Sequence, residues 1–142
     1  MGLIMTKIRL TNFIDAQAAL NGTLPASAVR TVEIEALADS GAINLAIPED
    51  VAEYLGLATL RTRSVKVADG RSIEVREAGA LNIEVLGREM TGEAIVLPRG
   101  TTPLLGAVQL EMLDLVLVAR TGEVITNPLH PDGAVIPLLR AG

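Results

Sequence analysis

Polar and apolar residues alternate along much of this chain, which is the pattern of β-strands that bury one face. The alternation predicts a half-exposed strand within residues 3–13 and a second strand over Val29–Leu37, which leads into Asp39. Residues 14–28 predict a loop, because they contain an Asn-Gly turn signal and a proline.

A second set of alternating segments lies in the middle of the chain. Asp69-Gly70 separates two of them within Ser64–Val75, and Asp-Gly in that setting is a strong hairpin signal. Strands are then expected over Gly79–Leu86 and Glu89–Leu97, joined by a turn at Gly87-Arg88. Their expected inward residues are Ile83, Val85, Ile95 and Leu97.

Two short segments have a helical pattern instead. In the first, Pro48 suits the first helical position, Gly56 suits the end, and Val51, Tyr54 and Leu55 share one face. The second covers Ala107–Leu113 and stops at Asp114, a residue type that tolerates the left-handed conformation.

Further strands are expected after Asp114. Leu115–Val118 is uniformly apolar and predicts a fully buried strand that turns at Thr121-Gly122. Val124-Ile125 and Val135–Leu139 are candidate closing strands. Seven to nine short strands with two short helices predict an all-β fold, a closed barrel or sandwich, and 142 residues suit a single domain over 1–142.

Composition excludes several classes of function. The chain is 49% apolar, has one Phe, one Tyr and no Trp, and carries a net charge of −5. Nucleic-acid binding, including a small DNA-binding regulator of swapped-barrel type, is therefore disfavoured. A lone histidine, His130, cannot build a zinc site, so neither a metal nor another cofactor is expected.

The same sequence bears on location. No apolar run approaches the length of a membrane span, and the first residues lack the order of a signal peptide. The chain has no cysteine, which fits a cytoplasmic protein. We therefore expect no contact with a membrane.

Asp39 is the main candidate for chemistry. Its carboxylate stands at a strand end between Ala38 and Ala42, and Ser40-Gly41 supplies a hydroxyl and close backbone approach. Carboxylates among apolar neighbours are rare unless paired or hydrogen-bonded. The tripeptide alone favours an ordinary turn over an active site, because Asp, Ser and Gly are common turn residues.

Three landmarks in order resemble the retroviral-type aspartic proteases (retropepsins) and their bacterial relatives. They are the Asp39-Ser40-Gly41-Ala42 turn, the hairpin at Asp69-Gly70, and Leu104-Leu105-Gly106 followed by a helical segment. The resemblance covers residues 3–118 and leaves 119–142 as a C-terminal extension.

The resemblance implies roles for these residues. Asp39 would be the catalytic aspartate, Ser40, Gly41 and Ala42 would form the active-site turn, and Leu104, Leu105 and Gly106 would cross behind it. The flap over the cleft would consist of Val67, Ala68, Asp69, Gly70, Arg71, Ser72 and Ile73.

Three positions depart from the family pattern. Ala38 replaces a larger aliphatic residue, and Asp114 stands where bacterial members usually have glycine. Ala107 replaces an arginine that braces the dimer in retroviral members, so a dimer would need another brace.

The implied activity is that of a homodimeric aspartic endopeptidase. The chain contains a single Asp-Ser-Gly, so Asp39 would face the Asp39 of a second copy across a two-fold axis. The substrate would be a polypeptide with apolar side chains flanking the cut. The alternative is a catalytically inactive dimeric β-domain of the same fold that binds peptides or partner proteins.

Overall fold

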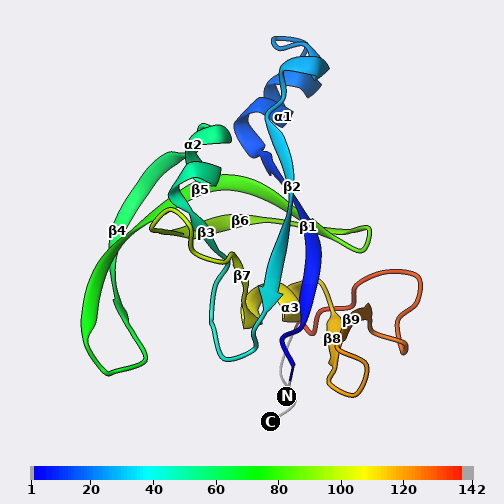
Figure 1. Ribbon diagram of the computed structural model, residues 1–142. Helices are drawn as coiled ribbons and strands as arrows, with labels where there is room; N and C mark the ends of the chain where they lie inside the picture. The colour runs from blue at the N-terminus through cyan, green and yellow to red at the C-terminus, as the bar shows by residue number, and fades with distance from the viewer. Residues whose placement is uncertain (1, 139–142) are drawn as a thin grey trace.

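Residues 2–138, as described in the computed structural model, contain nine strands, three α-helices and one short 3₁₀ helix (Figure 1). The strands are β1 (Met5–Asn12), β2 (Thr31–Ala38), β3 (Ala46–Pro48), β4 (Ala58–Lys66), β5 (Ser72–Val85), β6 (Arg88–Leu97), β7 (Leu104–Leu105), β8 (Leu115–Val118) and β9 (Glu123–Thr126). The helices are α1 (Phe13–Leu20), η1 (Ala26–Ala28), α2 (Glu49–Tyr54) and α3 (Ala107–Met112). No helix within residues 2–138 is long and apolar enough to cross a membrane.

Six of the strands close into a barrel. They follow the order β1-β2-β7-β3-β6-β5, and β5 pairs back onto β1. Closure leaves β4 outside the ring, where it pairs with β5 alone. The predicted all-β fold with a closed barrel is therefore confirmed.

The hydrophobic core of the barrel is built from aliphatic side chains. The alternation in β1 buries Ile8 and Leu10 completely, as a strand with one buried face requires. The other fully buried large apolar side chains are Leu45, Ile47, Leu55, Leu81, Ile83, Val85, Leu105 and Leu113.

The loop prediction for residues 14–28 is wrong, because α1 and η1 lie there. Asn12 caps α1 by accepting the N–H of Asp15 at 3.0 Å, and the helix ends before the Asn-Gly signal. The buried Asp15 carboxylate accepts bonds from Nε and Nη2 of Arg30, and these hold its pKa below the ordinary value. The Asn-Gly turn signal therefore corresponds to the end of α1 and not to a loop over the whole segment.

The central hairpin is longer than its sequence pattern predicts. The segments predicted as separate strands, one ending at Val75 and one starting at Gly79, are both parts of β5. A register shift between Gly79 and Leu81 changes which alternate residues of β5 lie in the core. Ala78 is fully buried before the shift, and Ile83 and Val85 are buried after it, as predicted.

The predicted inward residues of β6 are wrong. Ala94 and Val96 are buried, whereas Ile95 and Leu97 are only half-buried. The turn falls one residue earlier than predicted, but the reason lies in the pairing, which sets Val85 opposite Arg88 and Ile83 opposite Met90. Directly opposite residues of an antiparallel pair lie on the same face, so even-numbered residues of β6 share the buried face of Ile83 and Val85.

The helix α2 begins one residue later than predicted. Pro48 is its extended N-cap and also the last residue of β3. Within the predicted apolar face Leu55 is buried and Val51 half-buried, but Tyr54 is 63% exposed. Gly56 ends the segment with φ +64°, as its glycine suggests.

The C-terminal part differs most from its prediction. Asp114 adopts the left-handed conformation expected of it, and β8 pairs with β9. However, β8 is not fully buried, because only its first residue, Leu115, lies in the core. The stretch predicted to close the sheet, Val135–Leu139, is no strand over 135–138, and residue 139 lies outside the described residues.

Candidate active site

The Asp39 turn begins where β2 ends. The Asp39 N–H donates to the carbonyl of Leu105 at 3.0 Å, and the Ala42 N–H donates to the carbonyl of Asp39 at 3.1 Å. The carboxylate accepts the N–H of Gly41 on Oδ1 at 2.9 Å. Asp39 is half-buried while Ser40 and Gly41 are exposed, so the carboxylate is oriented from within the turn and open outward.

The segment Leu104–Gly106 lies directly behind this turn. Strand β7 runs parallel to the end of β2, with Leu104 beside Leu37 and Leu105 beside Ala38. A side chain at Gly106 would place its Cβ 2.6 Å from the carbonyl oxygen of Ile43. Only glycine allows this approach, so the backbone of one segment supports the other.

The first turn of α3 also holds the Asp39 turn. The Ala107 N–H donates to the carbonyl of Ala42 at 2.7 Å, and the Val108 N–H donates to the carbonyl of Ile43 at 3.0 Å. These donors would otherwise be unsatisfied at a helix start. Asp39 is thus held by β7, by α3 and by its own turn.

Residues from both ends of the described chain surround the turn. The Ala38 N–H donates to the carbonyl of Ile4 at 2.8 Å. A hollow of about 300 Å³ is lined by Leu3, Ile4, Asp39, Ser40 and Leu117, among others. The sequence alone does not place Leu3, Ile4 and Leu117 here, since no local motif marks residues that only the fold brings together.

The predicted flap segment forms the tip of the β4–β5 hairpin. The Gly70 N–H donates to the carbonyl of Val67 at 2.9 Å, and the Asp69 carboxylate accepts the N–H and Nε of Arg71. These contacts lower the pKa of Asp69, the backbone N–H most strongly.

The hairpin and the Asp39 turn lie on the same side of the barrel but are not in contact around the Asp39 hollows. In Figure 1 both descend below the strands, with the hairpin at the left. The hollows lined by Asp39 or Ser40 include no residue of the hairpin tip, 67–73. The structure therefore brings Leu104–Gly106 onto the turn, but it does not bring the predicted flap there.

A buried carboxylate at the hairpin base was not anticipated. Glu77 is fully enclosed and accepts Nε of Arg63 at 2.8 Å and Nη1 of Arg61. Burial raises the pKa of Glu77, but the two guanidinium groups outweigh that effect and leave it below the ordinary value. The hairpin register could have predicted this ion pair, because it places Arg61 opposite Glu77.

Other candidate sites are weaker. A hollow of about 660 Å³ lies beside α1 and does not include Asp39. Its Arg9 is already paired with Glu33 at 2.7 Å and lies 3.8 Å from Glu84. Within residues 2–138 no group of three or more His, Asp or Glu side chains is placed to hold a metal ion.

Comparison with known families agrees with the geometry of the Asp39 turn. A family model described as aspartyl protease, from the retropepsin-like clan, matches residues 16–108, well over half of the chain. The matched segment includes the Asp39 turn, the β4–β5 hairpin and Leu104–Gly106. A search of curated proteins found no match. The chain belongs to the aspartyl protease family of the retropepsin-like clan.

Proposed function

We propose that the chain is a homodimeric aspartic endopeptidase that activates water between two Asp39 carboxylates, one from each protomer. The observation that supports this most is the Asp39 turn. Its carboxylate is oriented by Gly41 and open outward, and its backbone is fixed by Leu105 and Ala107. Such fixing gives the preorganisation that catalysis needs.

One carboxylate is not enough for this reaction. Two carboxyl groups a few ångström apart cannot both ionise comfortably, so they share a proton and titrate as a coupled pair; the aspartic-protease dyad is the standard example. The ionised member takes a proton from water as the water oxygen attacks the scissile carbonyl carbon. The protonated member donates to the carbonyl oxygen. Return of a proton to the amide nitrogen then breaks the C–N bond.

A second copy is the best source of the second carboxyl group. Asp15 is held by Arg30, Glu77 by two arginines, and Asp114 by residues of the C-terminal extension. Donors of the same chain already take up the hydrogen-bond acceptor positions of these carboxylates. A two-fold axis next to the Asp39 turn would supply an equivalent carboxylate in the same geometry.

The β4–β5 hairpin is proposed to close over a bound polypeptide. It carries a free edge on β4 and lies on the same side of the barrel as the turn, so a movement toward the turn would exclude water. The apolar Ile43, 73% exposed next to the turn, supports a preference for apolar side chains flanking the cut.

The test is cleavage of a mixed peptide library from about pH 4 to about pH 7, with and without pepstatin. We expect cleavage that pepstatin inhibits and that Asp39→Asn reduces by at least about a thousandfold, the upper range for a general acid–base residue. Asp132→Asn, an exposed aspartate in the extension, is the matched control and should cleave normally.

Two outcomes would contradict the proposal. Undiminished cleavage by Asp39→Asn would remove Asp39 from the chemistry. A protein that is dimeric but cleaves nothing over this pH range would favour the alternative, a binding module of the same fold.

A further inference from the structure

The C-terminal extension is fastened to the end of α3 by one carboxylate. Oδ2 of Asp114 lies 2.6 Å from Nδ1 of His130 and accepts the N–H of Val135 at 3.1 Å. Oδ1 accepts Nδ2 of Asn127 at 3.0 Å. All three partners belong to the extension, so a single side chain fixes a long stretch of irregular backbone.

Arg88 provides a second fastening from the barrel. Its Nη1 donates to the carbonyls of Leu113 and Asp114 at 3.2 and 2.9 Å, and its Nη2 donates to the carbonyl of His130. The guanidinium is buried and lies 3.8 Å from the Asp114 carboxylate. A buried guanidinium needs such acceptors, so the extension satisfies a group of the barrel.

The backbone at Asp114 does not itself require an aspartate. Its φ of +55° is left-handed, a conformation that glycine adopts without strain. The carboxylate is therefore used for fastening the extension rather than for ending α3.

This fastening places the apolar tail, defined here as Val135-Ile136-Pro137-Leu138, next to the Asp39 turn. Val135 and Pro137 line a hollow of about 350 Å³ together with Ser40, Ala107 and Leu117. Leu117 and Ser40 also line the hollow that contains Asp39. Ala107 offers no long side chain there, so Val135 and Pro137 add to the apolar surface that Leu117 provides on this side of the turn.

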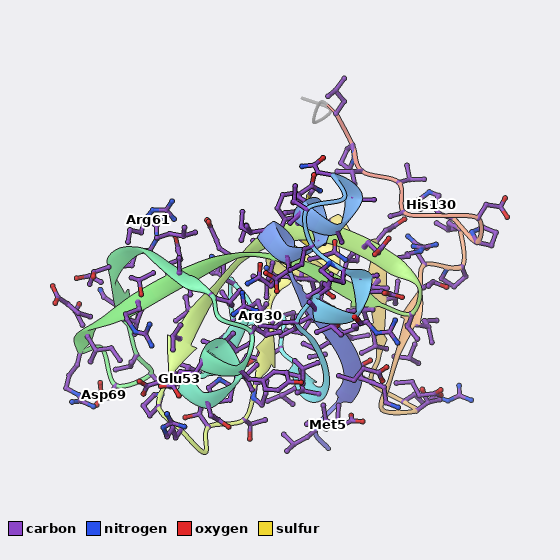
Figure 2. All side chains as sticks on the ribbon, turned by 90° about the horizontal axis from the view of Figure 1, so that it is seen from above. Met5, Arg30, Glu53, Arg61, Asp69 and His130 are labelled. Carbon is purple, nitrogen blue, oxygen red and sulfur yellow. The ribbon has the colours of Figure 1, made fainter. Side chains whose placement is uncertain are left out.

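The apolar tail is largely uncovered in a single chain. Leu138 is 95% exposed, Val135 53% and Ile136 47%, and Leu3 beside Asp39 is 76% exposed. The hairpin does not cover them, because it lies on the other side of the molecule. Figure 2 shows Asp69 at the hairpin tip and His130 of the extension at opposite sides, and Figure 1 agrees.

We infer that the apolar tail, held in place by Asp114, forms part of the contact with a second copy of this chain beside Asp39. The inference rests on the proposed dimer, because an Asp39 that faces its symmetry mate brings the partner against the surface around the turn. One flank of that surface is the hairpin side, which substrate needs. The other flank carries the tail, whose apolar side chains gain from burial there.

The first test is Asp114→Gly, which keeps the left-handed backbone and removes every contact of the Asp114 side chain with the extension. We expect the dimer dissociation constant, measured by analytical ultracentrifugation, to rise at least about tenfold. Specific activity should become dependent on protein concentration and return to the wild-type value when the dimer is saturated. The matched control is Asp132→Gly, which alters an exposed aspartate of the same extension and should leave the dimer unchanged.

A second pair of variants does not touch the fastening. Leu138→Glu puts a charge on the tail, whereas Leu129→Glu puts the same charge on another largely exposed leucine earlier in the extension. We expect only the first to weaken the dimer, and both to keep the wild-type circular dichroism. Wild-type dimerisation by both Asp114→Gly and Leu138→Glu would overturn the inference.

The outcomes separate the inference from the proposed function. If the wild type is dimeric and the tail variants are monomeric, but no peptide is cleaved, the inference stands and the proposed endopeptidase activity falls. If cleavage occurs and the tail variants dimerise normally, the inference falls alone. A wild type that stays monomeric at every concentration overturns both.

Discussion

Two turns of this molecule each begin with an aspartate, and they use it in opposite ways. Asp39 follows β2 and Asp114 follows α3, and both side chains are half-buried. In the described chain, the hydrogen bond to the Asp39 carboxylate comes from Gly41 within its own turn. The Asp114 carboxylate is surrounded by donors from the extension and by the Arg88 guanidinium.

The difference shows in the electrostatics of Asp114. Hydrogen bonds from Asn127 and from the Val135 N–H, with His130 beside them, lower its pKa to about 2. A carboxylate whose acceptor positions are filled by its own chain stays ionised and serves the structure. One that is fixed from behind and open in front keeps acceptor positions for a ligand or a partner.

The largest effect on activity is expected from removing the charge of Asp39. Asp39→Asn should abolish peptidase activity while leaving the melting temperature within about 1 °C of wild type, because the side chain makes few contacts with its own chain. Parallel activity and thermal unfolding measurements check this. A large loss of stability would mean that Asp39 is a structural aspartate like Asp114.

The support behind the Asp39 turn gives the next largest effect. Gly106→Ala places a Cβ 2.6 Å from the Ile43 carbonyl oxygen and 2.8 Å from the Asn44 backbone nitrogen, so backbone must move. We expect a loss of about 1–3 kcal/mol in the free energy of unfolding, as for overpacked sites, with a loss of activity. Urea unfolding measures it.

Gly133→Ala is the matched control for this substitution. A Cβ at Gly133 would meet no atom within 4 Å, so its stability should stay near wild type. Equal stability of the two variants would show that the crossing of Leu104–Gly106 behind the turn is not tight.

The sequence predicts the barrel strands better than the details around the site. Alternation finds β1 and β2, and Asp-Gly finds the hairpin, because these signals act within a few residues. It misplaces the inward residues of β6, because Ile83 and Val85 stand opposite even-numbered residues of β6 and share a face with them. It misses α1 because turn-forming residues such as Pro25 predict a loop there. The helix is stabilised instead by hydrogen bonds with Asn12 and Arg30, which lie outside the predicted loop.

The site divides along the same line. The Asp39 turn and Leu104–Gly106 are short motifs that a resemblance can identify. The contacts of Asp114 depend on Asn127, His130 and Val135, which no periodicity connects to it. The departure from glycine at position 114 was visible in the sequence, but its partners were determined only by the fold.

Glu77 is a third carboxylate to compare with Asp39 and Asp114. It is fully buried, and two arginines donate hydrogen bonds to it. Glu77→Gln would leave Arg61 and Arg63 without their anionic partner at the hairpin base. We expect a loss of about 1–2 kcal/mol, at the low end for charged hydrogen bonds because both arginines are half exposed. Faster amide hydrogen exchange in β4 and in the first half of β5 would be the local sign. Glu74→Gln, on the exposed part of the hairpin, is the control.

The smallest effect is a pH dependence that isolates Asp114. Because its folded pKa of about 2 lies below the unfolded value of 3.8, its contribution to stability is present above about pH 4 and is lost as the pH falls through about 2. Asp114→Asn tolerates the same left-handed backbone but has no charge to lose. In urea unfolding, the wild type should be more stable than Asp114→Asn by a margin that shrinks from about pH 4 to about pH 2. The neighbouring Arg88 and the other carboxylates are the same in both proteins and do not contribute to this difference.

Asp132→Asn is the control, and its difference in free energy of unfolding from the wild type should not change over the same pH range. An advantage of the wild type over Asp114→Asn that persists unchanged at about pH 2 would mean that the charge of Asp114 does not fasten the extension, and the contrast with Asp39 would then rest on shape alone.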